Sequence, residues 1–162
     1  MSRLFPLVCL LLTAIAMALS LAHVAEMPGK MRLDRETYFT VQQQLYYPGF
    51  TIGGIAEPLG ALAILALLIF APLPGVRFWW AVLALGCLVA MQLVFWFVTQ
   101  PVNAAWTRDM NLQGLGGLFF SIFPIEISGD WTRLRDIWEY SHAARAALAL
   151  IAFLAFARAI MA

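Results

Sequence analysis

Two histidines and two glutamates of this chain lie in or beside long apolar stretches, where ionisable groups are rare and usually functional. His23 and Glu26 are three positions apart in "LAHVAEMPGK", Glu57 lies in "GGIAEPLG", and His142 lies in "SHAARAALAL". Imidazole and carboxylate together are the ligand set of non-haem iron and, in other geometries, of copper, manganese or zinc. One hypothesis is therefore a metal site formed by His23, Glu26, Glu57 and His142.

A second hypothesis needs no metal or other cofactor. His142 or a glutamate would act as general base on a carbon acid, and Arg145 and Asn103 would stabilise the enolate that forms. Arg145 lies two turns inside an apolar segment and needs a buried carboxylate such as Glu26 or Glu57. Both routes suit a lipophilic aromatic substrate that enters from the bilayer.

The composition identifies the chain that carries these groups as an integral membrane protein. Hydrophobic residues make up 63% of the 162 positions and charged residues 12%, and the mean hydropathy is +0.84. Soluble domains have roughly 45–50% apolar and about 25% charged residues. The net charge is only +1 and basic residues do not cluster, which excludes nucleic acid as a partner.

The apolar pattern predicts an all-α fold, a single-domain four-helix up-and-down bundle over residues 1–162. A bilayer core of about 30 Å needs about 20 apolar residues per helix, and the chain has room for four such spans. They are expected at residues 4–26, 53–72, 76–100 and 137–161.

The two long connections have their own expected structure. The first carries alternating charges and is predicted to hold a short amphipathic helix from Arg35 to Tyr46. The second, residues 111–131, is too short and too rich in glycine to cross the membrane, so it is predicted to be an interfacial or re-entrant segment.

The up-and-down topology brings most of the polar groups to one end of the bundle. Spans one and three end on the side where spans two and four begin. Gln92, in the middle of span three, is the one strongly polar span residue expected to lie away from that end. The predicted substrate pocket there is lined by Trp96, Thr99, Trp106, Trp138 and Glu139. Polar residues often occur at span ends only because they reach the interface or form a hydrogen bond. A purely structural role is therefore the alternative for each residue.

The orientation and processing of the chain are predicted from its basic residues and its first span. Both termini are expected in the cytoplasm and the protein in a bacterial inner membrane, because the first span then acts as an uncleaved start signal. The alternative is a signal peptide cleaved after Ala22. His23 would then become the N-terminus and could chelate a metal through its amine and its ring.

Several motifs resemble the DUF1772 family of small, anthrone-oxygenase-like membrane proteins. They are "PVNAAW" at residues 101–106 and "WTRLRDIWEYSHAARAALAL" at 131–150, with "AHVAEMPGK", "QLYYPGF" and "GGIAEPLG" earlier in the chain. The resemblance implies a four-span bundle and, for some relatives, oxygenation of an activated aromatic carbon with few cofactors. The residues that match the family pattern are Asn103, Trp138, His142 and Arg145. The loop that begins at Asn111 is longer than the compact loop expected of the family.

Two functions from different classes follow. The first is an oxygenase or related oxidoreductase that acts on a lipophilic aromatic or quinone-like small molecule in the polar pocket. The second is a non-catalytic membrane subunit or a lipid- or small-molecule-binding scaffold, as a homo-oligomer or in a membrane complex, whose polar cluster is structural. A transporter is disfavoured because the chain has no internal repeat.

Overall fold

The computed structural model describes residues 4–46, 49–107, 127 and 129–161, and within these ranges it is helical, without a strand. Four stretches are long and apolar enough to cross a membrane: Leu4–Lys30, Thr51–Phe70, Val76–Trp106 and Trp131–Met161. The predicted all-α fold with four candidate spans is confirmed. The elements are α1 (Leu4–Lys30), α2 (Arg35–Val41), η1 (Gln42–Tyr46), α3 (Thr51–Phe70), α4 (Val76–Val94), η2 (Phe95–Thr99), α5 (Gln100–Thr107) and α7 (Trp131–Met161), where η marks a π-helical turn.

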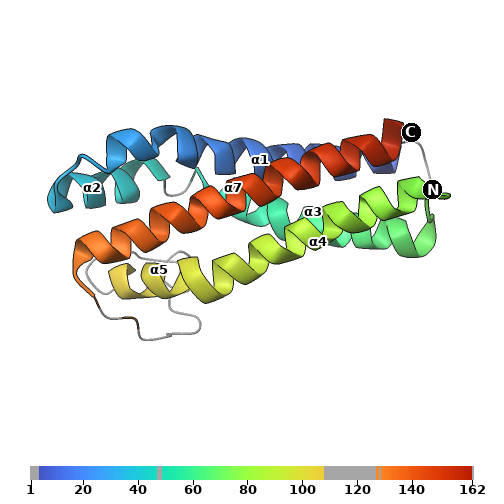
Figure 1. Ribbon diagram of the computed structural model, residues 1–162. Helices are drawn as coiled ribbons and strands as arrows, with labels where there is room; N and C mark the ends of the chain where they lie inside the picture. Colours follow the sequence, from blue (N-terminus) through green and yellow to red (C-terminus); the bar gives the residue numbers. More distant parts are fainter. Residues whose placement is uncertain (1–3, 47–48, 108–126, 128, 162) are drawn as a thin grey trace.

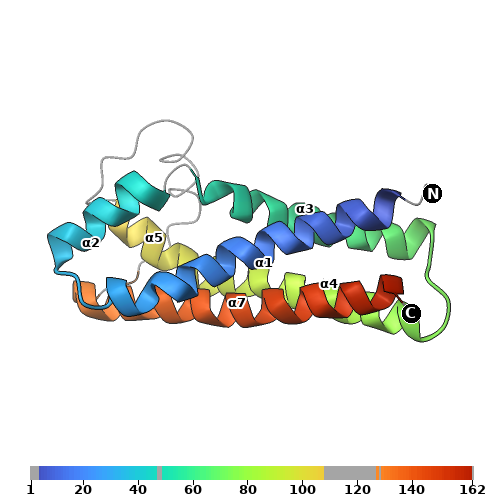
Figure 2. The ribbon, with the colours of Figure 1, turned by 90° about the horizontal axis from the view of Figure 1, so that it is seen from above.

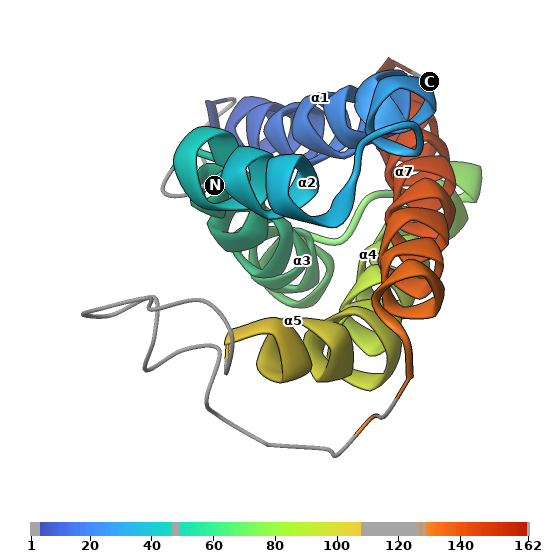
Figure 3. The ribbon, with the colours of Figure 1, turned by 90° about the vertical axis from the view of Figure 1, so that its left-hand side faces the viewer.

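The four spans form a ring in which each helix packs on two neighbours. α7 packs against α1 and α4, and α3 packs against the same two helices. Both termini and the α3–α4 connection lie at one end of the bundle, here called the hairpin end, whereas α2 and α5 lie at the other (Figure 1). The view turned by 90° shows the same division along the bundle axis (Figure 2). An end-on view shows α2 lying across this second end, here called the α2 end (Figure 3).

Small residues allow α4 and α7 to pack closely over the half of the bundle nearer the hairpin end. Ala81 and Ala84 of α4 and Ala149 and Ala152 of α7 have no exposed surface. Lipid tails are as apolar as leucine, so membrane helices associate mainly through close backbone approach and hydrogen bonds, for which small residues are suited. This half of the core is therefore apolar and contains none of the predicted site residues.

The hairpin end is closed by a tight turn and one arginine. Gly75, with φ of 60°, ends the turn between α3 and α4 in a conformation that favours glycine. Two residues later, the Arg77 guanidinium donates to the carbonyls of Ala159 and Ile160, at 2.8 and 3.4 Å. These bonds satisfy carbonyls in the last turn of α7 that have no partner within the helix.

The first span is longer than predicted, because Pro28 does not end it. The predicted end is residue 26, but α1 continues through Pro28 to Lys30, and the Met31 amide still donates to the Met27 carbonyl at 2.9 Å. A proline removes one helical hydrogen bond and crowds one carbonyl. Near a helix end this loss is small, and the added turn carries Lys30 into the protein interior.

The third span also continues past its predicted end at residue 100, to Trp106. The five residues of η2 come directly before Gln100 and Pro101, and the Thr99 hydroxyl donates to the Val94 carbonyl across this wide turn at 3.5 Å. Proline cannot donate a backbone hydrogen bond, and a π-helical turn before it rearranges the bonding pattern without ending the helix.

The remaining boundaries differ less. The second span is Thr51–Phe70 instead of 53–72, and the fourth begins at Trp131, six residues before its predicted start. The predicted helix from Arg35 to Tyr46 is confirmed as α2 followed by η1. The segment predicted to be interfacial, residues 111–131, lies outside the described residues except for its last positions.

Candidate functional site

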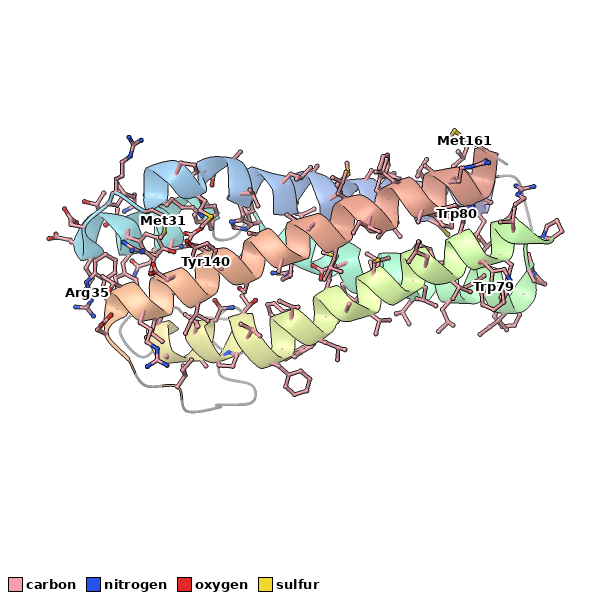
Figure 4. All side chains as sticks on the ribbon, in the orientation of Figure 1. Met31, Arg35, Trp79, Trp80, Tyr140 and Met161 are labelled. Carbon is pink, nitrogen blue, oxygen red and sulfur yellow. The ribbon has the colours of Figure 1, made fainter. Side chains whose placement is uncertain are left out.

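The positions of the site residues along α7 can be compared with the thickness of a bilayer. A hydrocarbon core of about 30 Å takes about 20 helical residues, so with Arg158 at the hairpin-end interface the core extends back to Trp138. Arg145, seven residues further along α7 than Trp138, then lies about 10 Å inside the apolar layer. Met31 and Tyr140 lie toward the α2 end, and Trp79 and Trp80 at the opposite end, where tryptophan suits the interface (Figure 4).

The deepest polar contact is an ion pair between α7 and α3, the inner ion pair. Arg145 Nη2 lies 2.6 Å from Glu57 Oε2, and both side chains are buried. Gln92 of α4 donates to the other oxygen of Glu57 at 3.1 Å. Three helices thus share one buried carboxylate. Gln92, expected to lie away from the polar end, joins the polar cluster because the cluster extends this far into the bundle.

His142 is held as a neutral imidazole by two neighbours on its own helix. Its Nδ1 lies 2.9 Å from the Trp138 carbonyl, which can only accept, so Nδ1 carries the proton. Its Nε2 then accepts from Arg145 Nη1 at 3.3 Å. The basic nitrogen of His142 therefore already has a donor, which makes His142 a poorer candidate for the general base than predicted.

His23 lies at the centre of an aromatic group, the histidine layer, formed by His23, Tyr46, Phe50, Trp138 and His142. The His23 ring centroid is 4.4 Å from that of His142, 4.3 Å from Phe50, 4.9 Å from Tyr46 and 5.3 Å from Trp138. His23 is 8% exposed, and its Nδ1 has no hydrogen-bond partner among the described residues. Among the described residues, His23 Nδ1 is therefore available to a ligand.

A second ion pair, the outer ion pair, closes the layer toward the α2 end. Lys30 Nζ lies 2.9 Å from Glu139 Oε2, and the Tyr38 hydroxyl donates to Glu139 Oε1 at 2.7 Å. The Lys30 ammonium also stands 5.0 and 4.9 Å from the ring centroids of Tyr46 and Trp138, distances at which a cation is attracted to an aromatic face. Glu139, predicted to line the substrate pocket, thus has Oε1 hydrogen-bonded to Tyr38, whereas Oε2 meets Lys30 as an ion pair without hydrogen-bond geometry.

Burial and the glutamates hold two tyrosines in their protonated form. Burial, followed by the charge of Glu139, raises the pKa of Tyr38 well above its ordinary value. Burial and the hydrogen bond that Tyr46 donates to Glu26 raise the pKa of Tyr46 in the same way. Glu26 is exposed, so Tyr46 connects the histidine layer to a carboxylate at the surface.

The third span positions Trp138 and its helix. The Trp138 indole donates to Asn103 Oδ1 at 2.9 Å, and Thr99 and Ser141 share a hydrogen bond of 2.9 Å. Asn103 therefore orients an aromatic ring, and its own amide donates to Gln100 Oε1 at 3.4 Å. Trp106 packs beside Trp138, with ring centroids 6.0 Å apart and the rings tilted by 38°, and Trp96 packs against Phe95 at 5.1 Å.

The four predicted metal ligands are not gathered around one point. Among residues 4–46, 49–107, 127 and 129–161, no three His, Cys, Asp or Glu side chains lie close enough to hold a metal ion. His23 and His142 do meet, but Glu57 is turned to Arg145 and Glu26 to Tyr46. Arginine and tyrosine thus engage the two carboxylates that the metal hypothesis requires.

Five residues of this site are not among the predicted site residues: Lys30, Tyr38, Tyr46, Phe50 and Gln92. Gln92 had a usable signal, since it precedes Thr99 by seven positions and shares its helix face. Lys30, Tyr38 and Tyr46 come from the first connection or its border, where a charged or aromatic residue is ordinarily read as interfacial.

Comparisons with known proteins find no protein similar to this chain. The chain matches no protein-family model, and comparison with curated proteins and with solved structures finds no match. The resemblance to the DUF1772 family therefore stays a prediction from the motifs.

Proposed function

We propose that this membrane protein is an oxygenase that acts on a lipophilic aromatic carbon acid, with His23 as the general base. The observation that carries the proposal is the unpartnered Nδ1 of His23, buried among aromatic rings beside the neutral His142. The resemblance to the anthrone-oxygenase-like family supplies the reaction class. No metal is required by this route, which suits a site whose carboxylates are already paired.

The histidine layer suits a planar ligand. Phe50 and Tyr46 belong to the segment between α2 and α3, not to the four spans, and they cover one side of His23. Displacement of these rings by an aromatic ligand would exchange one stacking contact for another at little cost. Trp138, held by Asn103, is a further ring of the layer, with its centroid 5.3 Å from that of His23.

The proposed reaction balances without a reductant. His23 removes one proton from a methylene that is activated by a ketone conjugated to it through aryl rings, leaving an enolate. The enolate carbon donates its electrons to O₂ and forms a C–O bond, and the distal oxygen of the resulting peroxide takes up a proton to give a hydroperoxide. Loss of water then leaves a second carbonyl, so that R₂CH₂ and O₂ become R₂C=O and H₂O. Arg145 holds the tautomer and position of His142, and Lys30 supplies positive charge near Trp138.

The test uses the full chain in lipid nanodiscs with anthrone as the probe substrate and ¹⁸O₂ as the oxidant. We expect labelled anthraquinone at a rate well above that of empty nanodiscs, and a loss of about 10²–10⁴-fold in His23→Ala, the usual contribution of a general base. Glu36→Gln, an exposed change on α2, serves as the matched control. A wild-type rate equal to that of empty nanodiscs would overturn the proposal.

A second function is favoured by a different observation. Glu57 and Glu139 each have two partners within the protein, as a purely structural hydrogen-bond network would require. The chain would then be a non-catalytic membrane subunit or scaffold. In that case His23→Ala lowers the unfolding temperature, and no anthrone is oxidised above background by either protein.

A further inference from the structure

A groove on the lipid-facing side of α7 lies apart from the histidine layer. It encloses about 660 Å³ between the third span and α7, a volume typical of small-ligand sites. Val94 and Val98 form one wall, and Ile137, Ser141 and Ala144 form the other, with Arg133 at one end. The groove is open to its surroundings along its length, since Val98 and Ala144 are exposed.

The polarity of the groove changes along its axis. Arg133 lies in the first turn of α7, five residues before Trp138 and hence in the interfacial layer. Ala144, eleven residues further on, lies about 17 Å from Arg133 along the helix. This length is close to the thickness of one leaflet, about 15 Å of the hydrocarbon core. The groove thus runs from the headgroup level to the middle of the bilayer.

The polar side chains of the lining have partners within the protein: Asp136 pairs with Arg135 at 2.8 Å, and the Thr132 hydroxyl donates to Asp130 at 2.6 Å. Thr99 and Ser141 are bonded to one another behind the groove at 2.9 Å, and Ser141 also donates to the Trp138 carbonyl at 2.7 Å. The basic group on the groove is the exposed guanidinium of Arg133, at its interfacial end. A suitable occupant therefore has one anionic end and a long apolar remainder.

We propose that this groove binds a phospholipid, with its phosphate on Arg133 and one acyl chain along Val94, Val98 and Ala144. Guanidinium groups bind phosphate oxygens with paired, charge-assisted hydrogen bonds. Tyr140, 61% exposed and also part of the groove lining, is placed to pack against the glycerol region, because tyrosine prefers this depth. The site does not depend on the proposed oxygenase activity.

Native mass spectrometry of the full chain in detergent tests the site with phosphatidylglycerol and with diacylglycerol of the same acyl chains. We expect one tightly retained phosphatidylglycerol and an affinity about fivefold lower for Arg133→Gln, the value of roughly 1 kcal/mol per basic residue. Ala144→Phe, which fills the deep end, should also reduce retention. Arg32→Gln removes a charge from an exposed arginine at the same end of the bundle and is the matched control.

A phosphatidylglycerol with a photoreactive group in mid-chain gives a second readout. Cross-links should map to the peptides that carry Val94, Val98 and Ala144, and they should decrease in Ala144→Phe. Equal lipid retention by wild type, Arg133→Gln and Ala144→Phe would overturn the proposal. It would also be overturned if diacylglycerol bound as tightly as phosphatidylglycerol. A third contrary result would be that anthrone displaces the lipid and that the affinity for anthrone is the same in wild type and Arg133→Gln.

Discussion

Arg145 and Glu57 form an ion pair of 2.6 Å across 88 positions of the sequence, at a depth where neither charge could remain alone. Breaking a buried pair by removing one partner is strongly destabilising, because the other charge is left uncompensated. Replacing both charges avoids that penalty. The ion pair should therefore affect both the stability of the protein and the energetic coupling between changes at Glu57 and Arg145.

Glu57→Gln and Arg145→Gln should each lower the free energy of unfolding by about 3–5 kcal/mol. The double variant should lose clearly less than the sum of the two losses, since neither charge remains unpaired. Unfolding by SDS in mixed micelles measures all three. Glu36→Gln with Arg32→Gln, both exposed, provides the control pair and should change little. Additive losses would show that the two residues do not interact as described.

Tyr38 predicts how stability depends on alkaline pH. Its pKa is raised in the folded protein by burial and by Glu139, so the protonated form stabilises the fold. This stabilisation is complete below the unfolded pKa of about 10 and is lost progressively as the pH rises above it. Tyr46, with its pKa raised in the same direction, adds to the effect.

The variant Tyr38→Phe separates this effect from other alkaline transitions. It should be less stable by about 1–3 kcal/mol at neutral pH, because Glu139 loses a buried donor. Its unfolding midpoint should then fall less steeply than that of the wild type above about pH 10. The tyrosinate absorbance of the two folded proteins should be equal there. Earlier ionisation in the wild type would contradict the burial of Tyr38.

Asp130 is expected to stabilise the start of α7. Its carboxylate accepts from the Thr132 hydroxyl at 2.6 Å and the Arg133 amide at 2.8 Å, and these bonds hold its pKa below the ordinary value. Asp130→Ala should lower the unfolding midpoint, and Asp130→Asn should restore most of it, because asparagine is an equally good N-cap. The benefit of the ionised form is present above pH about 4 and is lost as the pH falls below it.

The corresponding change at α2 is the comparison for this measurement. Asp34 caps α2 through the Thr37 amide at 2.8 Å, but α2 has only seven residues and does not span the membrane. Asp34→Ala should therefore affect the bundle less than Asp130→Ala does. An equal effect of both changes would mean that the loss is a general consequence of removing surface charge.

The number and kind of elements could be predicted from the sequence, because about 20 apolar residues in a row leave few alternatives to a membrane helix. The ends of the helices were harder to predict than their number. Pro28 and Pro101 normally indicate helix ends, yet the structure passes through both. Asp130 offered a local N-cap signal for the true start of α7.

Topology alone predicts that polar groups from all four spans gather at one end, but it predicts neither the contribution of Tyr38 and Tyr46 nor how the charged groups pair. His23 and His142 meet as the up-and-down arrangement requires. The partners of Glu57 and Glu139 depend on helix rotation and on side-chain reach, which spacing does not determine. Lys30 illustrates this, since its position relative to Glu139 follows from a turn of helix beyond Pro28.

The π-helical turn at Phe95–Thr99 has one further consequence, for insertions and deletions in this gene region. Each residue of an α-helix turns the chain by about 100°, so removing a single residue from this turn would rotate everything after it relative to α4. Asn103 would then no longer face Trp138, although no residue of the site had changed. The third span thus consists of two helical segments whose relative rotation is set by this turn. The number of residues in the turn is therefore as constrained as their identity.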